Sequence, residues 1–208
     1  ISRVQGHAFG GAIGLIAADG SLSKNGRHIN FTSKDAELIQ TFRDCLGLHD
    51  IKIGVKSSGY KPHGTCYYVQ FGDVLFYKFL IELGLHANKS HTIAQLKIPD
   101  EYFFFFFFHQ WDGDGIFYFS QDKRWRVSYV ISISFVSASK VYLLWLQSTI
   151  NKKISTRGFI KRGIRGYQLC YAKADSLQLL KAMFYRNNLP HLPRKFAKAK
   201  EIYRIDKL

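Results

Sequence analysis

Hydrophobic and polar positions recur along the first half of the chain with two spacings, one typical of helices and one typical of strands. Apolar residues fall at helical spacing at Leu38, Ile39, Phe42 and Leu46, and Gly47 ends that segment. Stretches on either side alternate between apolar and polar residues, which indicates antiparallel strand pairs. The first half is predicted to contain a helix at residues 7–18, two short strands within residues 21–33 and a helix at residues 34–46. Strands at residues 51–56 and 67–71 and a helix at residues 73–84 are expected to follow.

The same order of elements is predicted again in the second half. Its helices and strands are expected at residues 101–112, 115–121, 126–136, 138–150, 154–161, 166–172 and 174–186, with a further helix from Pro193. Such a repeat of element order is better explained by duplication than by chance. The predicted fold class is α+β, with two pseudo-symmetric αββαββα repeats, each a curved antiparallel sheet with helices on one face. We expect repeats at residues 1–88 and 101–208, joined by a linker at residues 89–100.

The charge of the chain favours a polyanionic partner. Thirty Lys and Arg residues against fifteen Asp and Glu residues give a formal net charge of +15 over 208 residues. A charge of this size and sign is typical of nucleic-acid-binding proteins. The alternative from charge alone is a basic soluble protein without such a partner.

Cysteine and histidine usage gives no support for a disulfide framework or a zinc site. Cys45, Cys66 and Cys170 form no CxxC pair, and the eight histidines form no HxxxH or HxH pair. We therefore expect an intracellular, reducing compartment. A nucleic-acid partner would place the chain with its DNA, in the cytoplasm, the nucleoid or an organelle matrix.

The apolar runs of the chain do not predict a membrane segment. Residues 8–18 lack a basic leader and end at Asp19, and the phenylalanine run at residues 103–108 is far shorter than the roughly 20 residues that span a bilayer. Because residue 1 is Ile rather than Met, we expect the chain to be an internal or trimmed product.

Two predicted helices end in similar patterns of small residues and aspartate. Residues 12–20 read AIGLIAADG, and an aspartate stands again 95 residues later (114 − 19 = 95), within the DGDG of residues 112–115. The first segment resembles the nonapeptide that names the LAGLIDADG family, and the second resembles the family's frequent second ending. Each is followed by the same order of strands and helices, so the resemblance covers the whole chain. The chain thus resembles single-chain, two-motif LAGLIDADG homing endonucleases, in which the motif helices pack at the repeat interface.

Small residues along the first motif helix support this resemblance independently. Gly10, Gly14 and Ala18 recur every four positions, which places them on one face of a helix. A second helix can approach such a face until the two backbones nearly touch.

The resemblance implies a site-specific endonuclease that makes a double-strand break in a long, nonpalindromic DNA target. Asp19 and Asp114 would be its catalytic, metal-binding aspartates, and two carboxylates at the foot of a helix pair suit Mg²⁺. The family pattern adds the backbone carbonyls of Ala18 and Gly113 as ligands. Mg²⁺ or Mn²⁺ would support cleavage, and Ca²⁺ would bind without supporting it. The structural alternative is that both aspartates merely end helices at turns.

The resemblance also carries over one basic residue beyond the last helix of each repeat. Lys89 and Lys195 stand at these positions and would help to position water and offset developing phosphate charge. Either residue, considered alone, would more often be a solvated surface lysine. Ser33 and Ser137 stand where the family often places Gln, and their shorter side chains favour no catalytic role.

Successive side chains of the predicted strands point to opposite faces of each sheet, and the polar face is expected to lie in the DNA major groove. Apolar residues of both repeats are expected to face the core: Leu22, Ile29, Phe31, Ile51, Ile53, Val55, Tyr67, Val69, Phe71, Phe117, Phe119, Val127, Tyr129, Ile131, Ile133 and Phe135. Their neighbours are expected to face DNA: Ser21, Ser23, His28, Asn30, Thr32, Lys52, Lys56, Tyr68, Gln70, Tyr118, Ser120, Arg126, Ser128, Ser132, Ser134, Arg157 and Gln168. Basic residues at hairpin tips are expected to meet phosphates: Lys24, Arg27, Lys61, His63, Lys123, Arg124, Lys161, Arg162 and Arg165. The alternative for any one of them is plain solvent exposure.

The second motif helix departs from the family pattern. His109 stands where glycine is expected from the 95-residue offset, and phenylalanine occupies residues 103–108. Either this helix is buried nearly all round, or the segment is degenerate and the second active centre is weakened. Because residues 112–115 are intact, we expect cleavage to survive, with the two strands cut at unequal rates.

Two other functions fit the same fold. The chain could be a maturase that binds its host intron RNA, or a DNA-binding protein that has lost cleavage. Asp19 and Asp114 argue against the loss of cleavage, and the absence of splicing blocks argues against an intein. We expect a monomer, because one chain carries both motifs.

Overall fold

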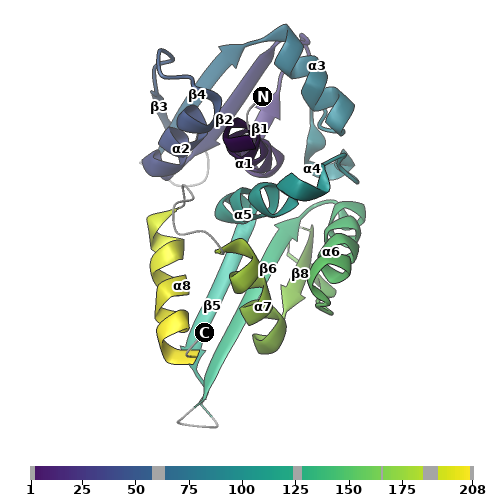
Figure 1. Ribbon diagram of the computed structural model, residues 1–208. Helices are drawn as coiled ribbons and strands as arrows, with labels where there is room; N and C mark the ends of the chain where they lie inside the picture. Colours follow the sequence, from purple (N-terminus) through teal and green to yellow (C-terminus); the bar gives the residue numbers. More distant parts are fainter. Residues whose placement is uncertain (1–2, 58–63, 124–127, 165, 185–191, 207–208) are drawn as a thin grey trace. The chain divides into compact units, whose positions relative to one another are not determined.

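Two four-stranded antiparallel sheets form the frame of the protein, one in each half of the chain (Figure 1). The computed structural model describes residues 3–57, 64–123, 128–164, 166–184 and 192–206. By contact, the chain divides into two units, residues 1–113 and 114–208. Each unit is described by itself.

The first unit holds one sheet in the order β1-β2-β4-β3, covered by helices. Its elements are α1 (Arg3–Asp19), β1 (Gly20–Leu22), β2 (His28–Ser33), α2 (Ala36–Leu46), β3 (Gly54–Ser57), β4 (Thr65–Gly72), α3 (Val74–Leu83), α4 (Lys89–Thr92), the 3₁₀ turn η1 (Asp100–Tyr102) and α5 (Phe103–Asp114).

Alternating apolar residues of the central strands build the core of this unit. Ile29, Phe31 and Val69 are fully buried, and Phe31 stacks on Phe42 of α2 with ring centroids 4.6 Å apart. Helix α3 begins where the Asp73 side chain accepts a hydrogen bond from the backbone N–H of Phe76. The apolar residues that recur at strand spacing and those that recur at helix spacing therefore pack together in one buried layer.

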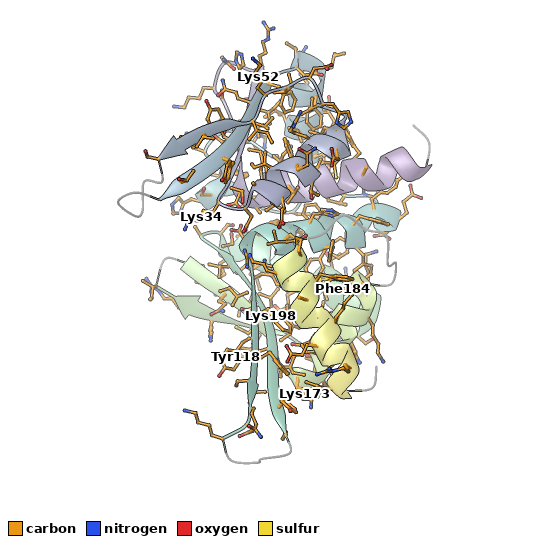
Figure 2. The ribbon with its side chains drawn as sticks, turned by 90° about the vertical axis from the view of Figure 1, so that its left-hand side faces the viewer. Lys34, Lys52, Tyr118, Lys173, Phe184 and Lys198 are labelled. Carbon is orange, nitrogen blue, oxygen red and sulfur yellow. The ribbon has the colours of Figure 1, made fainter. Side chains whose placement is uncertain are left out.

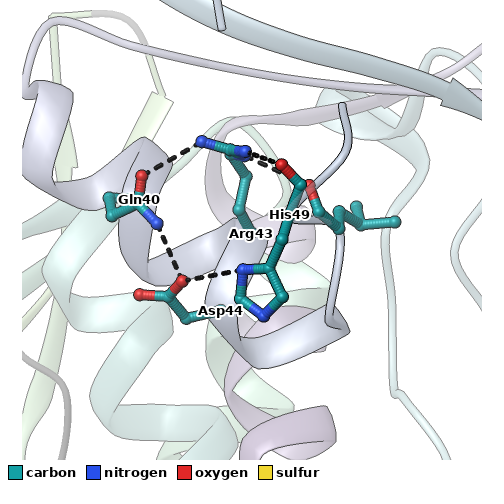
Figure 3. Close-up of polar contacts among 5 residues, drawn as sticks. Gln40, Arg43, Asp44 and His49 are labelled. Carbon is teal, nitrogen blue, oxygen red and sulfur yellow. Dashed lines mark hydrogen bonds and ion pairs between the residues drawn. The ribbon is translucent and has the colours of Figure 1, made fainter. Parts of the chain in front are cut away.

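Helix α2 ends in a polar cluster that fixes the loop leading to β3 (Figure 3). The Arg43 guanidinium donates to Gln40 Oε1 at 3.1 Å, to the Leu48 carbonyl at 3.2 Å and to the carbonyl of His49. Gly47 ends the helix with a φ of +66°, a left-handed conformation that glycine adopts without strain. Lys52 follows on this loop and is exposed (Figure 2).

The second unit repeats the arrangement, with one sheet in the order β5-β6-β8-β7. Its elements are β5 (Gly115–Gln121), β6 (Tyr129–Ser137), α6 (Lys140–Ile154), β7 (Phe159–Gly163), β8 (Gly166–Tyr171), α7 (Lys173–Met183) and α8 (Pro193–Asp206). Ile131, Ile133 and Phe135 of β6 are buried as predicted. The predicted fold class and the helix that begins at Pro193 are confirmed.

Several predicted boundaries are wrong. The first helix begins at Arg3 rather than residue 7, and residues 51–53 precede β3 rather than forming part of it. The predicted core residue Val55 is 63% exposed, because β3 is an edge strand that the helices do not cover. The predicted linker at residues 89–100 includes the short helix α4, and its role as a linker stays a prediction.

No helix in the described ranges combines the length and apolar character needed to cross a membrane.

Candidate active site and nucleic-acid interface

Helices α1 and α5 pack with their backbones in contact at Gly14. A Cβ atom at Gly14 would lie 2.2 Å from the Phe106 carbonyl oxygen and 2.9 Å from the Gln110 amide nitrogen. Real Cβ atoms essentially never come so close to backbone atoms, so only glycine fits here. The small-residue face predicted for the first motif helix does allow this close approach.

The His109 side chain packs against Gly11, which is next to Gly10 in the sequence and is not part of the predicted small-residue face. A Cβ atom at Gly11 would lie 2.9 Å from His109 Cε1, so the imidazole ring occupies the space that a side chain would need. Its Nδ1–H donates to the Phe105 carbonyl at 2.9 Å. Residues 103 and 105–112 are all buried, so α5 is enclosed nearly all round, as the first of the two interpretations expects.

The C-terminal ends of α1 and α5 lie side by side. A Cβ atom at Gly113 would lie 2.5 Å from Ala18 Cβ and 3.3 Å from Asp19 Oδ2. Three of the four predicted metal-binding residues therefore meet within the first unit, and the Asp19 side chain is exposed there. The fourth, Asp114, is the next residue after Gly113 and is half-buried.

Lys89 is buried at the end of the first motif helix. It is 8% exposed, and its ammonium donates to the Ala18 carbonyl at 3.1 Å. The sequence alternative of a solvated surface lysine is therefore wrong for Lys89. Its positive charge lies beside one of the predicted metal-binding carbonyls.

Lys195 has the matching place in the second unit. It is 5% exposed, and its ammonium donates to the Gly115 carbonyl at 2.8 Å. Because Gly115 directly follows Asp114, each repeat holds one buried lysine against the end of its own motif helix. A solvated surface position is likewise wrong for Lys195.

Tyr142 lies near Asp114 and was not identified from the sequence. Its side chain is 2% exposed, and its phenol has no hydrogen-bond partner among the described residues. Burial, and next the negative charge of Asp114, raise the pKa of Tyr142 well above its ordinary value. The phenol therefore stays protonated and can donate a hydrogen bond.

Ser33 and Ser137 each bind the backbone of the N-cap residue of the helix that follows, Asp35 of α2 and Ser139 of α6. Their hydroxyl oxygens accept the backbone N–H of Asp35 and Ser139, each at 3.1 Å. These two equivalent contacts align the repeats with an offset of 104 residues (139 − 35 = 104), which places Leu38 opposite Tyr142. The only signal in the sequence for Tyr142 would have been this offset.

The residues at the paired helix ends suit a hard divalent cation. Carboxylate and carbonyl oxygens are the donors that Mg²⁺ and Mn²⁺ prefer. Within the described residues, no group of three or more His, Cys, Asp or Glu side chains could hold a metal ion, so this donor set would depend on backbone carbonyls. The Ala18 carbonyl, one of the predicted ligands, already accepts a hydrogen bond from the Lys89 ammonium, which would compete with a metal ion for that oxygen.

The polar face of the first sheet forms a connected network. Lys56 Nζ donates to Thr32 Oγ1 at 3.0 Å and lies 5.3 Å from the centre of the Tyr68 ring. Thr32 donates to Asn30 at 2.8 Å, and Asn30 donates to Gln70 at 3.4 Å across neighbouring strands. Five of the residues predicted to face DNA therefore share one face.

The second sheet differs because its central polar residues are partly enclosed. Ser134, predicted to point outward, is 3% exposed, and its Oγ accepts a 2.7 Å hydrogen bond from half-buried Gln168. Tyr118 is 54% exposed (Figure 2), and its phenolic oxygen accepts a hydrogen bond from Ser120 at 2.9 Å. Phe117, Phe119 and Tyr129, predicted for the core, are only half-buried.

The remaining predicted contact residues are accessible to different degrees. Exposed residues among them are Ser21, Lys24, Arg27, Lys52, Lys123, Arg157, Lys161 and Arg162, and half-buried residues are Ser23, His28, Ser128 and Ser132. The predicted contacts Lys61, His63, Arg124, Arg126 and Arg165, and the predicted core residue Val127, lie outside the described residues.

Comparison with known proteins identifies the fold as that of two-repeat LAGLIDADG proteins. The homing endonuclease I-WcaI bound to its DNA recognition sequence is 15% identical, with a TM-score of 0.66 over 95% of this chain and 86% of that chain. The meganuclease I-SmaMI bound to DNA is 14% identical, with a TM-score of 0.58 over 96% of this chain and 89% of that chain. These likenesses establish the fold.

Residues 13–84 match the model of the LAGLIDADG-like domain family. The resemblance of the chain to the LAGLIDADG family is confirmed.

The same fold also occurs in full-length DUF199/WhiA from Thermatoga maritima. That protein is 13% identical, with a TM-score of 0.63 over 100% of this chain. The chain spans only 62% of the length of that protein. No curated protein sequence matches the chain.

Proposed function

We propose that the chain is a site-specific DNA endonuclease that cuts both strands of a long, nonpalindromic target by metal-dependent hydrolysis. The observation that carries this proposal is the meeting of Ala18, Asp19 and Gly113 at the paired ends of α1 and α5. Double-stranded DNA is the proposed partner, supported by the net charge of +15 and by the DNA-bound structures of I-WcaI and I-SmaMI.

In the proposed reaction, the side chains of Asp19 and Asp114 would hold Mg²⁺ or Mn²⁺, together with the backbone carbonyls of Ala18 and Gly113. A bound divalent cation would activate water and stabilise the attacking and leaving oxygens of the phosphodiester. Lys89 and Lys195 place a fixed positive charge at each helix end, where negative charge develops on the phosphate. Strand residues of both sheets read bases, and basic residues at the hairpin tips bind phosphates.

Substitution of Asp19 or Asp114 by Asn tests this proposal. Loss of one carboxylate charge removes metal affinity, so we expect cleavage in Mg²⁺ to fall by about 100-fold or more. The dissociation constant for DNA in Ca²⁺ should change by less than about threefold, because most affinity comes from phosphate contacts elsewhere. Targets are first obtained by selecting cleaved sites from a randomised DNA library, and gel-based cleavage and fluorescence anisotropy are the measurements.

Asp50→Asn is the matched control, because Asp50 is exposed on the loop after α2. It should cleave at the wild-type rate. If the wild-type protein binds DNA but never cuts it in Mg²⁺ or Mn²⁺, the enzyme proposal fails, and a non-cutting binder of DNA or intron RNA remains.

A further inference from the structure

A basic pocket lies at the start of α8 in the second unit. It has a volume of about 250 Å³, and we call it the α8 pocket; its lining residues are Gly115, Ile116, Phe117, Arg194, Lys195 and Lys198. Three of these six residues are cationic and none is acidic. Positive charges gathered in one pocket favour an anionic ligand.

The three cations of the α8 pocket have different roles. Lys195 is buried and donates to the Gly115 carbonyl, which fixes the first turn of α8 against the start of β5. Arg194 and Lys198 are exposed and four residues apart, so they lie on one face of α8, one turn apart. Figure 2 shows Lys198 on this helix. A fixed inner charge and two accessible outer charges can surround one anionic group.

The wall of the α8 pocket also contains apolar surface. Ile116 is 46% exposed there, beside the backbone of Gly115. A phosphodiester fits this combination, since its oxygens can face the cations while the attached sugar packs against the isoleucine. Arginine, moreover, can bind a phosphate through two parallel hydrogen bonds.

We propose that the α8 pocket binds a backbone phosphate of the DNA strand whose scissile bond lies at Asp114. This inference rests on the proposed function, because it takes DNA as the ligand. Gly115 both lines the pocket and directly follows Asp114, which places the bound phosphate close to the scissile one along the strand. Arg194 and Lys198 thereby become phosphate-binding residues.

The first repeat has no equivalent of the two outer charges. Lys89 matches Lys195 through its hydrogen bond to the end of the motif helix, with an offset of 106 residues (195 − 89 = 106). At that offset, Arg194 corresponds to Asn88 and Lys198 to Thr92, both neutral. The proposed phosphate contact therefore belongs to the second repeat alone.

The salt dependence of DNA binding tests the pocket. The double variant Arg194→Gln, Lys198→Gln is titrated with a random-sequence 30-base-pair duplex in EDTA, over a series of KCl concentrations. Loss of the pocket contact should reduce the slope of log Kd against log salt by about 1. The matched control is Lys152→Gln, Lys181→Gln, which removes two exposed charges from α6 and α7 and should leave the slope within about 0.3 of wild type.

The conservative variant Arg194→Lys, Lys198→Arg keeps both charges and should retain the wild-type slope. A double-glutamine variant whose slope equals that of the control would overturn the pocket proposal, while the proposed function would stand. A wild-type protein that does not bind the duplex at all would instead remove the proposed function.

Neutral backbone linkages in the selected DNA target identify which phosphate the α8 pocket binds. A single methylphosphonate is placed at each position near the cut sites in turn, and binding is measured in Ca²⁺. We expect one position, in the half of the target bound by the second repeat, to weaken wild-type binding about tenfold and to leave the double-glutamine variant unaffected. If every position affects both proteins equally, the assignment of a phosphate to this pocket is wrong.

Discussion

At the scale of single residues, Lys89 and Lys195 are the clearest case of a side chain whose environment differs from the usual one. A lysine considered alone is expected in solvent, yet both are buried and donate to carbonyls at the ends of the motif helices. The sequence resemblance located both positions. Only the structure places their charges beside the candidate active site.

Replacing Lys89 with Met tests whether its charge contributes to catalysis. Methionine keeps the apolar stem but removes the ammonium, so we expect the cleavage rate to fall by about 100-fold. Kd for the target in Ca²⁺ should stay within about threefold, since one buried charge adds little to phosphate affinity. Lys97→Met, at an exposed position in the same segment, should match wild type in both assays. Equal cleavage rates for the two variants would show that Lys89 is only structural.

At the scale of elements, the contact between α1 and α5 shows which contacts residue spacing predicts and which depend on packing. Small residues that recur every four positions predicted the contact at Gly14, because positions four apart share a helix face. It did not predict Gly11, which accepts the His109 ring, since that contact depends on the rotation of α5. Strand alternation was likewise reliable for Ile29 and Phe31 but not for Val55, which lies on the uncovered edge strand.

Two alanine substitutions on α1 test the helix contact. Gly14→Ala places a Cβ atom 2.2 Å from a backbone oxygen of α5, so the helices must separate, and we expect the free energy of unfolding to fall by about 3 kcal/mol. Gly10→Ala is the matched control, because its Cβ atom would lie 3.4 Å from its nearest neighbour, a side-chain atom. It should change stability by less than about 1 kcal/mol, helped by the higher helix propensity of alanine. Urea unfolding followed by circular dichroism measures both, and equal effects would contradict the close contact.

At the scale of the whole molecule, the two repeats share element order but differ at their candidate active centres. The second repeat has Tyr142 where the first has Leu38, and it alone has the outer charges of the α8 pocket. A duplicated chain can change each copy separately, because each half would meet a different half of the proposed nonpalindromic target. Unequal centres are therefore expected from the residues themselves.

Unequal centres should be visible on a supercoiled plasmid that carries one target. If the two strand-cleavage rates differ by roughly tenfold, a difference of about 1.4 kcal/mol in barrier, nicked circle accumulates before linear product in Mg²⁺. Primer extension on the nicked circle identifies the strand cut first. Linear product without a nicked intermediate would show that the two centres are equal.

The sequence by itself determined the order of elements, the duplication and the positions of Asp19 and Asp114, because periodicity and helix-ending motifs are local properties of the chain. Its charge, another property of the sequence alone, indicated a polyanionic partner. The tertiary structure decided which faces are covered, how His109 is accommodated, and which of the many basic residues are buried or gathered in a pocket. These outcomes depend on contacts between segments far apart in the chain, such as Lys195 with Gly115, and no local pattern contains them.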